Sequence, residues 1–155
     1  MPLPPLPESA VVIGAHADGW RDAVRLAGAA LARSGATLPG YSDEMIRMIE
    51  EHGAYVVIAP GLALAHARPG PDVLEDGLAI VTLSEPVTFG HPYNDPVTVV
   101  IALSVVSVGD HLESIAHLAN IFNDPSVIPA LAAATTAGEV LAILGIYGSA
   151  EQPAT

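Results

Sequence analysis

Residues 55–70 read Tyr-Val-Val-Ile-Ala-Pro-Gly-Leu-Ala-Leu-Ala-His-Ala-Arg-Pro-Gly. The first five residues are apolar and partly β-branched, which favours a strand, and the Pro60-Gly61 pair then favours a turn. A second short apolar run ends at His66, and Arg68 follows two residues later. A histidine at the end of a rigid strand, beside a cation and a loop, is placed to act on an anion. The alternative is a structural histidine that bonds a backbone carbonyl.

The rest of the chain predicts a sheet between helices. The apolar runs favour strands at 10–13, 55–59, 62–65, 77–83 and 97–106, the first of them at a sheet edge. Amphipathic patterns favour helices at 20–33, from about 42 to 52, and at 111–122, 125–134 and 137–144. Helices, then strands, then helices indicate an α/β fold: a three-layer sandwich with a four- or five-stranded sheet covered by helices on both faces.

Several helix starts carry their own signals. Asp18 is expected to cap the helix at 20–33, and Pro125 suits the first turn of the helix that follows it. Two pairs have the spacing of a capping box. These pairs are Asp110 with Glu113, and Thr136 with Glu139.

The length of 155 residues favours a single domain, which we place at residues 10–147. The proline-rich residues 1–9 predict a flexible leader, and the polar residues 148–155 a loose tail. No apolar stretch reaches the roughly 18 residues that a membrane-spanning helix needs. The chain has no cysteine, which excludes disulfides and zinc–thiolate sites and fits a cytoplasmic protein.

The charge is strongly acidic, with a formal net charge of −12 and only five basic residues, all arginine. This balance argues against nucleic acid, whose phosphates are neutralised by Lys and Arg, and against an anionic membrane surface. The absence of lysine excludes a P-loop and a Schiff-base mechanism. A basic protein partner is favoured, although solubility explains the charge equally well. Only Arg68 lies beside a candidate reactive group.

A second candidate, His111, stands in the first turn of a predicted helix, directly after a long apolar strand. Helix N-termini attract anions, phosphate above all, and favour a neutral imidazole. His111 alone could be an exposed residue without a role. Because His66 and His111 both follow strands, we predict that they meet at one edge of the sheet. His91 could line the same edge. The remaining histidines are expected to be structural or exposed: His16, His52 and His117.

Other chemistries have weaker support. A metal site formed by His66, His111 and Asp95 is possible, but no compact ligand spacing such as HExxH accompanies it. A serine hydrolase would need a G-x-S-x-G turn, which is absent. No segment points to a pair of catalytic carboxylates.

Four motifs in order resemble one known family: residues 53–69, 77–87, 89–97 and 110–113. They are similar to enzyme IIA of the sugar phosphotransferase system (PTS), in the mannitol/fructose class and nearest its ascorbate-type branch. The resemblance covers residues 20–145. It implies that His66 is the phosphorylated histidine and that His111 contacts the phosphoryl group. It also implies a mixed sheet between helices, as the residues indicate independently.

The resemblance implies partners as well. The phosphoryl donor would be the phosphocarrier protein HPr, the acceptor an enzyme IIB, and an enzyme IIC would carry the sugar across the membrane. No metal or other cofactor is implied, and an oligomer is possible. A regulatory enzyme IIA-like protein, phosphorylated in the same way but controlling a partner, is the alternative function.

Two departures from the family concern the neighbours of His66. Members usually have proline directly before the reactive histidine, whereas this chain has Ala65, which stiffens the backbone less. Mannitol-type members carry an arginine on the preceding helix, and Arg47 lies on the comparable helix at a poorly matching distance. We therefore expect Arg68 to neutralise phosphoryl charge. Attack is expected through Nε2 of His66, with Nδ1–H held by a backbone carbonyl.

Overall fold

The computed structural model describes residues 4–145, and its middle layer is a five-stranded mixed sheet. The strands are β1 (Val11–Ala15), β2 (Val57–Ala59), β3 (Leu62–His66), β4 (Gly77–Val87) and β5 (Val97–Ser104). Their order across the sheet is β1-β4-β5-β3-β2. The pairs β1/β4 and β3/β5 are parallel, and β4/β5 and β2/β3 are antiparallel. The predicted mixed sheet is confirmed, with β1 at an edge as expected.

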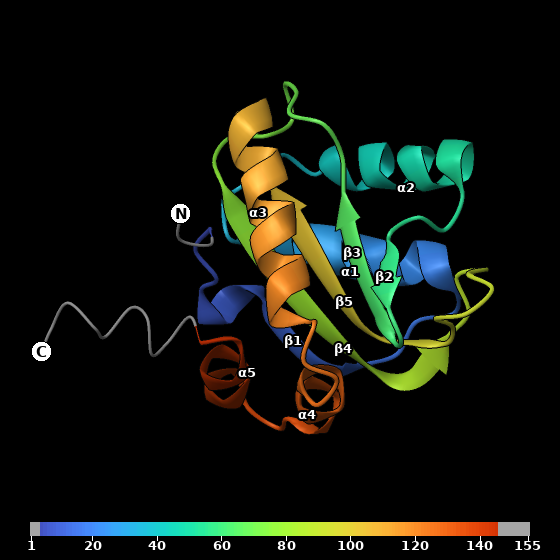
Figure 1. The fold of residues 1–155 in the computed structure, drawn as a ribbon. Coiled ribbons are helices and arrows are strands. Elements are labelled where there is room, and N and C mark those ends of the chain that lie inside the picture. The colour runs from blue at the N-terminus through green and yellow to red at the C-terminus, as the bar shows by residue number, and fades with distance from the viewer. Residues whose placement is uncertain (1–3, 146–155) are drawn as a thin grey trace, which may run out of the picture.

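Helices cover both faces of this sheet. A 3₁₀ turn, η1 (Glu8–Ala10), precedes five helices: α1 (Trp20–Arg33), α2 (Tyr41–His52), α3 (Val108–Ile121), α4 (Val127–Ala133) and α5 (Ala137–Leu144). In Figure 1, α1 lies behind the sheet and α3 crosses in front of it, which confirms the three-layer sandwich. Among the described residues, no helix has both the length and the apolar character that crossing a membrane requires.

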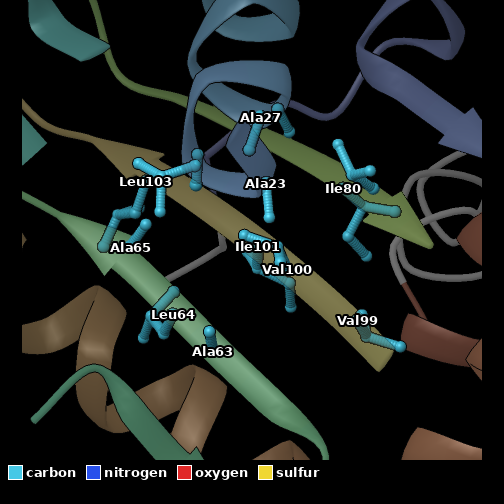
Figure 2. Close-up of a cluster of buried hydrophobic side chains, with 14 of the residues drawn as sticks. Ala23, Ala27, Ala63, Leu64, Ala65, Ile80, Val99, Val100, Ile101 and Leu103 are labelled. Atoms are coloured by element: carbon cyan, nitrogen blue, oxygen red, sulfur yellow. The ribbon is translucent and has the colours of Figure 1, made fainter. Parts of the chain in front are cut away.

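The core lies along the central strands β3, β4 and β5. Strand β5 is buried over nearly its whole length, as a strand with neighbours on both sides and helices on both faces must be. The small side chains of Ala23 and Ala27 let α1 lie close to this sheet (Figure 2). In β3 the burial ends at His66, the only residue of that strand that is partly exposed. The sheet therefore holds His66 rigidly while leaving its ring accessible.

Strand β4 is longer than predicted. The predicted strand ends at residue 83, yet β4 continues through Ser84, Glu85 and Pro86 to Val87, which pairs with Val97. The register with β5 shifts between Thr82 and Val87, so the intervening residues form an irregularity. A proline without an N–H group is tolerated at such a place.

One predicted helix start and one predicted helix cap are wrong. α3 begins at Val108, three residues early, because the Ser107 side chain caps it by accepting the N–H of Asp110 at 3.1 Å. The Asp110/Glu113 pair is therefore not a capping box. Asp18 does not cap α1 either: its N–H donates to the carboxylate of Asp22, and Gly19 is the N-cap.

Of the predicted start signals of α4 and α5, only the one for α5 is confirmed. α4 begins at Val127, so Pro125 precedes the helix instead of standing in its first turn. The capping box of Thr136 and Glu139 is confirmed at the start of α5, with both of its reciprocal hydrogen bonds present.

The described part of the leader, residues 4–9, is packed against the domain, unlike the flexible segment that its prolines predicted. Leu6 is buried. The carbonyl of Pro5 accepts the N–H of Leu78 at 3.0 Å, and that of Ser9 accepts from Arg33. One apolar anchor and these bonds fix the segment beside α1 and β4. The predicted tail at 148–155 lies outside the described residues.

Candidate functional site

His66 and His111 meet at one end of the sheet. His66 is the last residue of β3 and lies opposite Leu103 of the parallel strand β5. The chain leaves β5 at Ser104 and enters α3 at Val108, which brings His111 to the same end (Figure 1). The centroids of the two imidazole rings are 5.1 Å apart, with an interplanar angle of 61°. The predicted meeting of these histidines at one sheet edge is confirmed.

The geometry of His66 fixes its tautomer. Its Nδ1 lies 2.9 Å from the carbonyl oxygen of Leu64. Because a carbonyl only accepts hydrogen bonds, Nδ1 must carry the hydrogen, and Nε2 keeps its lone pair. Burial lowers the pKa of His66; the Leu64 carbonyl acts in the opposite direction, and nearby His111 lowers the pKa further. The ring is therefore neutral near pH 7, with Nε2 available as a nucleophile.

His111 lies at the end of the first turn of α3. Its backbone N–H donates to the Ser107 carbonyl at 3.0 Å, so the earlier N–H groups of Val108 and Gly109 have no partner within the helix. Burial lowers the pKa of its imidazole too. The Nδ1 atom of His111 is buried, and no hydrogen-bond partner for it occurs among residues 4–145. A neutral ring of this kind can donate one hydrogen to a negatively charged group.

A small hollow of about 260 Å³ contains both rings. Its walls are formed by Met48, His52, Tyr55, His66, Ala67, Arg68 and His111. The Tyr55 ring meets the His66 ring edge-on, with centroids 5.7 Å apart at 89°. His52 is exposed, as predicted, yet its ring lies 6.2 Å from that of Tyr55. Sequence reasoning missed Met48, His52 and Tyr55 as wall residues, because only the packing of the end of α2 beside β3 brings them there.

Arg68 is the arginine that stays available to a ligand. Three others pair with carboxylates, and Arg33 donates to a backbone carbonyl. Arg47, the alternative from the family pattern, is bound to Glu44 at 2.7 Å and Glu51 at 2.9 Å. Arg68 has neither kind of partner within residues 4–145, and it lines the hollow. The geometry therefore favours Arg68 over Arg47 as the cation next to His66.

Tyr41, at the start of α2, holds the backbone beside His66. Its buried hydroxyl accepts the N–H of Ala67 at 3.0 Å and donates to the carbonyl of Leu103 at 2.8 Å. Burial raises its pKa to about 12, so the hydroxyl keeps its hydrogen. This bridge ties the ends of β3 and β5 together on the C-terminal side of His66. These hydrogen bonds restrain the backbone next to His66, where Ala65 restrains it less than the proline usual in the family would.

Asp95 does not come together with the two histidines, as the possible metal site would require. Asp95 precedes β5, whereas His66 lies beside Leu103 near the far end of that strand, and the stretch from Val97 to Leu103 alone spans about 20 Å at ~3.3 Å per residue. Its carboxylate accepts the backbone N–H groups of Phe89, Gly90 and His91. Within residues 4–145, no three His, Asp or Glu side chains gather closely enough to hold a metal ion.

His91 is also absent from the site. It belongs to the same distant turn, where its Nδ1 accepts the N–H groups of Tyr93 and Asn94. The suggestion that it lines the edge with His66 is therefore wrong. Its role is to close the turn between β4 and β5.

Comparison with known proteins identifies the family to which this chain belongs. Residues 5–145 match the family model described as the phosphoenolpyruvate-dependent sugar phosphotransferase system, EIIA 2. The chain belongs to this enzyme IIA family. It is similar to the ascorbate-specific PTS EIIA component of Shigella boydii, with 37% identity over 131 residues, 84% of this chain and 85% of the relative. The Escherichia coli K12 protein of the same description is 36% identical over the same shares.

Solved enzyme IIA structures share the fold. A PTS IIA protein from Streptococcus mutans has a TM-score of 0.81 and 35% identity, covering 92% of this chain and 91% of that one. The mannitol enzyme IIA of E. coli, solved in complex with phosphorylated enzyme IIB, has a TM-score of 0.79 and 27% identity, covering 91% and 97%. The nitrogen regulatory IIA-Ntr of Neisseria meningitidis has 0.78 and 28%, covering 90% and 95%.

Proposed function

We propose that this enzyme IIA is a phosphoryl carrier that accepts phosphate from phospho-HPr on His66. It passes the group to an enzyme IIB, for uptake of an ascorbate-like substrate through an enzyme IIC. The main support is the neutral His66 ring, with Nδ1 bound to a carbonyl and Nε2 free, whose centroid lies 5.1 Å from that of a second half-buried histidine ring, His111. The ascorbate-specific relatives support the substrate class, and the mannitol complex supports enzyme IIB as the acceptor.

The transfer is an in-line displacement. The Nε2 lone pair of His66 attacks phosphorus and forms an N–P bond, while the bond from phosphorus to the donor breaks and the donor keeps that electron pair. The Nδ1 hydrogen stays on the ring and in its bond to the Leu64 carbonyl. The carbonyl dipole thereby stabilises the positive charge that develops on the imidazole. The reverse displacement passes the group on.

The charge on the phosphoryl oxygens needs donors that are already in place, since phosphoryl transfer depends chiefly on positioning and electrostatics. His111 would donate from Nε2–H. The N–H groups of Val108 and Gly109, which have no partner within the helix, would add the partial positive charge of the α3 N-terminus. Arg68 would supply the only full positive charge. The first two contributions come from the first turn of α3, and the third comes from the residue two places beyond the end of β3; His111 and Arg68 both line the hollow.

Labelling tests the acceptor residue. Purified protein is incubated with phospho-HPr carrying a radioactive phosphoryl group, and acid-labile label is counted. His66→Ala should take up none. His16→Ala removes an exposed histidine outside the hollow and should be labelled like the wild type. Labelling of His66→Ala at the wild-type stoichiometry would rule out His66 as the carrier.

The second candidate function is regulation of a partner, which the likeness to the nitrogen regulatory IIA-Ntr favours. Both functions share phosphorylation of His66, so the acceptor separates them. Labelled protein is mixed with an ascorbate-type enzyme IIB, and movement of the label is followed over time. Rapid transfer supports the carrier. Label that stays on the chain supports the regulator.

A further inference from the structure

The inner face of α3 carries two polar residues where apolar ones are normal. His111, Ser114 and Leu118 recur at helical spacing on the face toward the sheet. Ser114 is 2% exposed, so its hydroxyl is as inaccessible as a core side chain. Serine lowers helix propensity and adds almost no apolar area, so packing alone gives no reason for it at this position.

Unpaired buried polar atoms are few, and two of them are neighbours. Among the described side chains they are Oγ1 of Thr37, Nδ1 of His111 and Oγ of Ser114. His111 and Ser114 are three residues apart on one helix face, a spacing that puts side chains about 5–6 Å apart at Cβ. The hydroxyl of Ser114 does not donate to the backbone carbonyl one turn earlier, which is the hydrogen bond that a serine within a helix commonly makes.

The two atoms are chemically complementary. A hydroxyl can donate one hydrogen, and the unprotonated nitrogen of a neutral imidazole can accept one. Leaving both unpaired in a buried place costs about 1–3 kcal/mol each. The lowered pKa of His111 is consistent with a neutral ring that has such a nitrogen.

We propose that Ser114 is a positioning residue that donates its hydroxyl hydrogen to Nδ1 of His111, directly after a side-chain rotation or through one buried water. Nδ1 then cannot carry the ring hydrogen, which must stand on Nε2. His111 is thereby held as the donor tautomer that the proposed phosphoryl site needs. This role rests on the proposed function, although the tautomer itself can be measured without it.

Nitrogen-15 NMR of the unphosphorylated protein, labelled at histidine and recorded at pH 8, reads the tautomer directly. We expect the Nε2–H form of His111 to dominate in the wild type. In Ser114→Ala the preference should be lost, with a clear population of the Nδ1–H form. Ser114→Thr keeps the hydroxyl and should keep the wild-type tautomer.

A matched control removes an equally buried, equally unpaired hydroxyl elsewhere. Thr37→Val does this in the connection between α1 and α2, and it should leave the His111 spectrum unchanged. The wild-type spectrum is decisive even if Ser114→Ala does not fold. An Nδ1–H form of His111 in the wild type overturns the proposal, and so does an unchanged tautomer in Ser114→Ala.

Kinetics provide a second readout. Single-turnover transfer from phospho-HPr should be about tenfold slower in Ser114→Ala, the scale seen when a group that orients a functional histidine is removed. The phospho-HPr concentration at half-maximal rate should not change, because a buried serine cannot touch the partner. If Ser114→Ala shows the tautomer change but wild type accepts no phosphate, the proposed function fails and the positioning contact stands.

Discussion

At the scale of single residues, the site depends on two imidazoles that burial keeps neutral. Each ring has a lowered pKa, mainly through loss of hydration, and His66 is further affected by its neighbour. A positive charge on His111 also disfavours protonation of His66 at this separation. Neutrality matters differently for each ring: His66 needs a lone pair on Nε2, and His111 needs only one hydrogen.

This electrostatic state predicts the pH dependence of phosphorylation. The pKa of free histidine is 6.5, and that of His66 is lower in the folded chain. The nucleophilic form therefore persists as the pH falls through 6.5 and is lost only below that value. The rate constant for transfer from phospho-HPr, measured by rapid quench with the donor's own titration subtracted, should be flat from pH 8 to about 6.5. A decline centred above 6.5 would contradict a lowered pKa.

The two candidate arginines can be separated by substitution. Arg68→Gln removes the unpaired cation from the hollow and should slow transfer to His66 by about 100-fold, the lower end of the range for loss of a preorganised charge-stabilising group. Arg47→Gln breaks only exposed pairs with Glu44 and Glu51 and should change the rate less than twofold. Rapid-quench rates of the two variants give the comparison. A larger effect of Arg47→Gln would indicate that Arg47, the arginine on the helix where mannitol-type members carry theirs, neutralises the phosphoryl charge.

At the scale of elements, α1 and α2 approach each other closely at Gly28. Gly28 of α1 faces Ser42 of α2, and a Cβ on Gly28 would overlap Oγ of Ser42 and lie 2.9 Å from its Cβ. Rotation of the hydroxyl relieves only the first contact. The two helices must therefore move apart if residue 28 gains a side chain. Because α2 carries Tyr41, Met48 and His52, such a movement also disturbs the wall of the hollow.

Gly28→Ala should lower the free energy of unfolding by about 1–3 kcal/mol, although alanine is the better helix former. Gly138→Ala, at an exposed position of α5 with no atom nearer than 3.9 Å, should leave stability unchanged or raise it by about 0.5 kcal/mol. Urea unfolding measures both. Combining Gly28→Ala with Ser42→Gly should restore much of the loss, and a failure to do so would exclude the predicted overlap.

The elements also show what a sequence can predict. The strands were predictable because continuous apolar runs bounded by Gly and Pro leave few alternatives, and His66 and His111 followed from their places at strand ends. The start of α3 was not, because Ser107 and Asp110 both suit an N-cap and only the path of the chain from β5 selects between them. Tyr41 and Tyr55 were missed because tertiary packing alone brings them to His66.

At the scale of the whole molecule, the net charge of −12 sets the long-range field. It raises the encounter rate with a partner whose docking surface is basic, and salt screens it over about 8–10 Å at 0.10–0.15 M. The carboxylates that produce this negative field lie outside the hollow, which is lined by one arginine and no carboxylate. Encounter and transfer should therefore respond differently to salt.

The bimolecular rate constant for phosphorylation by phospho-HPr should fall on the order of tenfold between low salt and about 0.5 M salt. The maximal single-turnover rate at saturating phospho-HPr should change much less, because the reacting groups are half-buried. Stopped-flow or quench measurements over a salt series separate the two. A bimolecular rate constant that does not depend on salt would exclude steering by the acidic field.

The solitary Arg68 also bears on how long a phosphoryl group would stay. Such a group carries between one and two negative charges at neutral pH, whereas the described hollow is lined by one arginine. The occupied site would then be left with surplus negative charge in a chain that is already acidic. A phosphoryl group would consequently be held only briefly, because the same shortage of positive charge that slows its arrival would speed its departure.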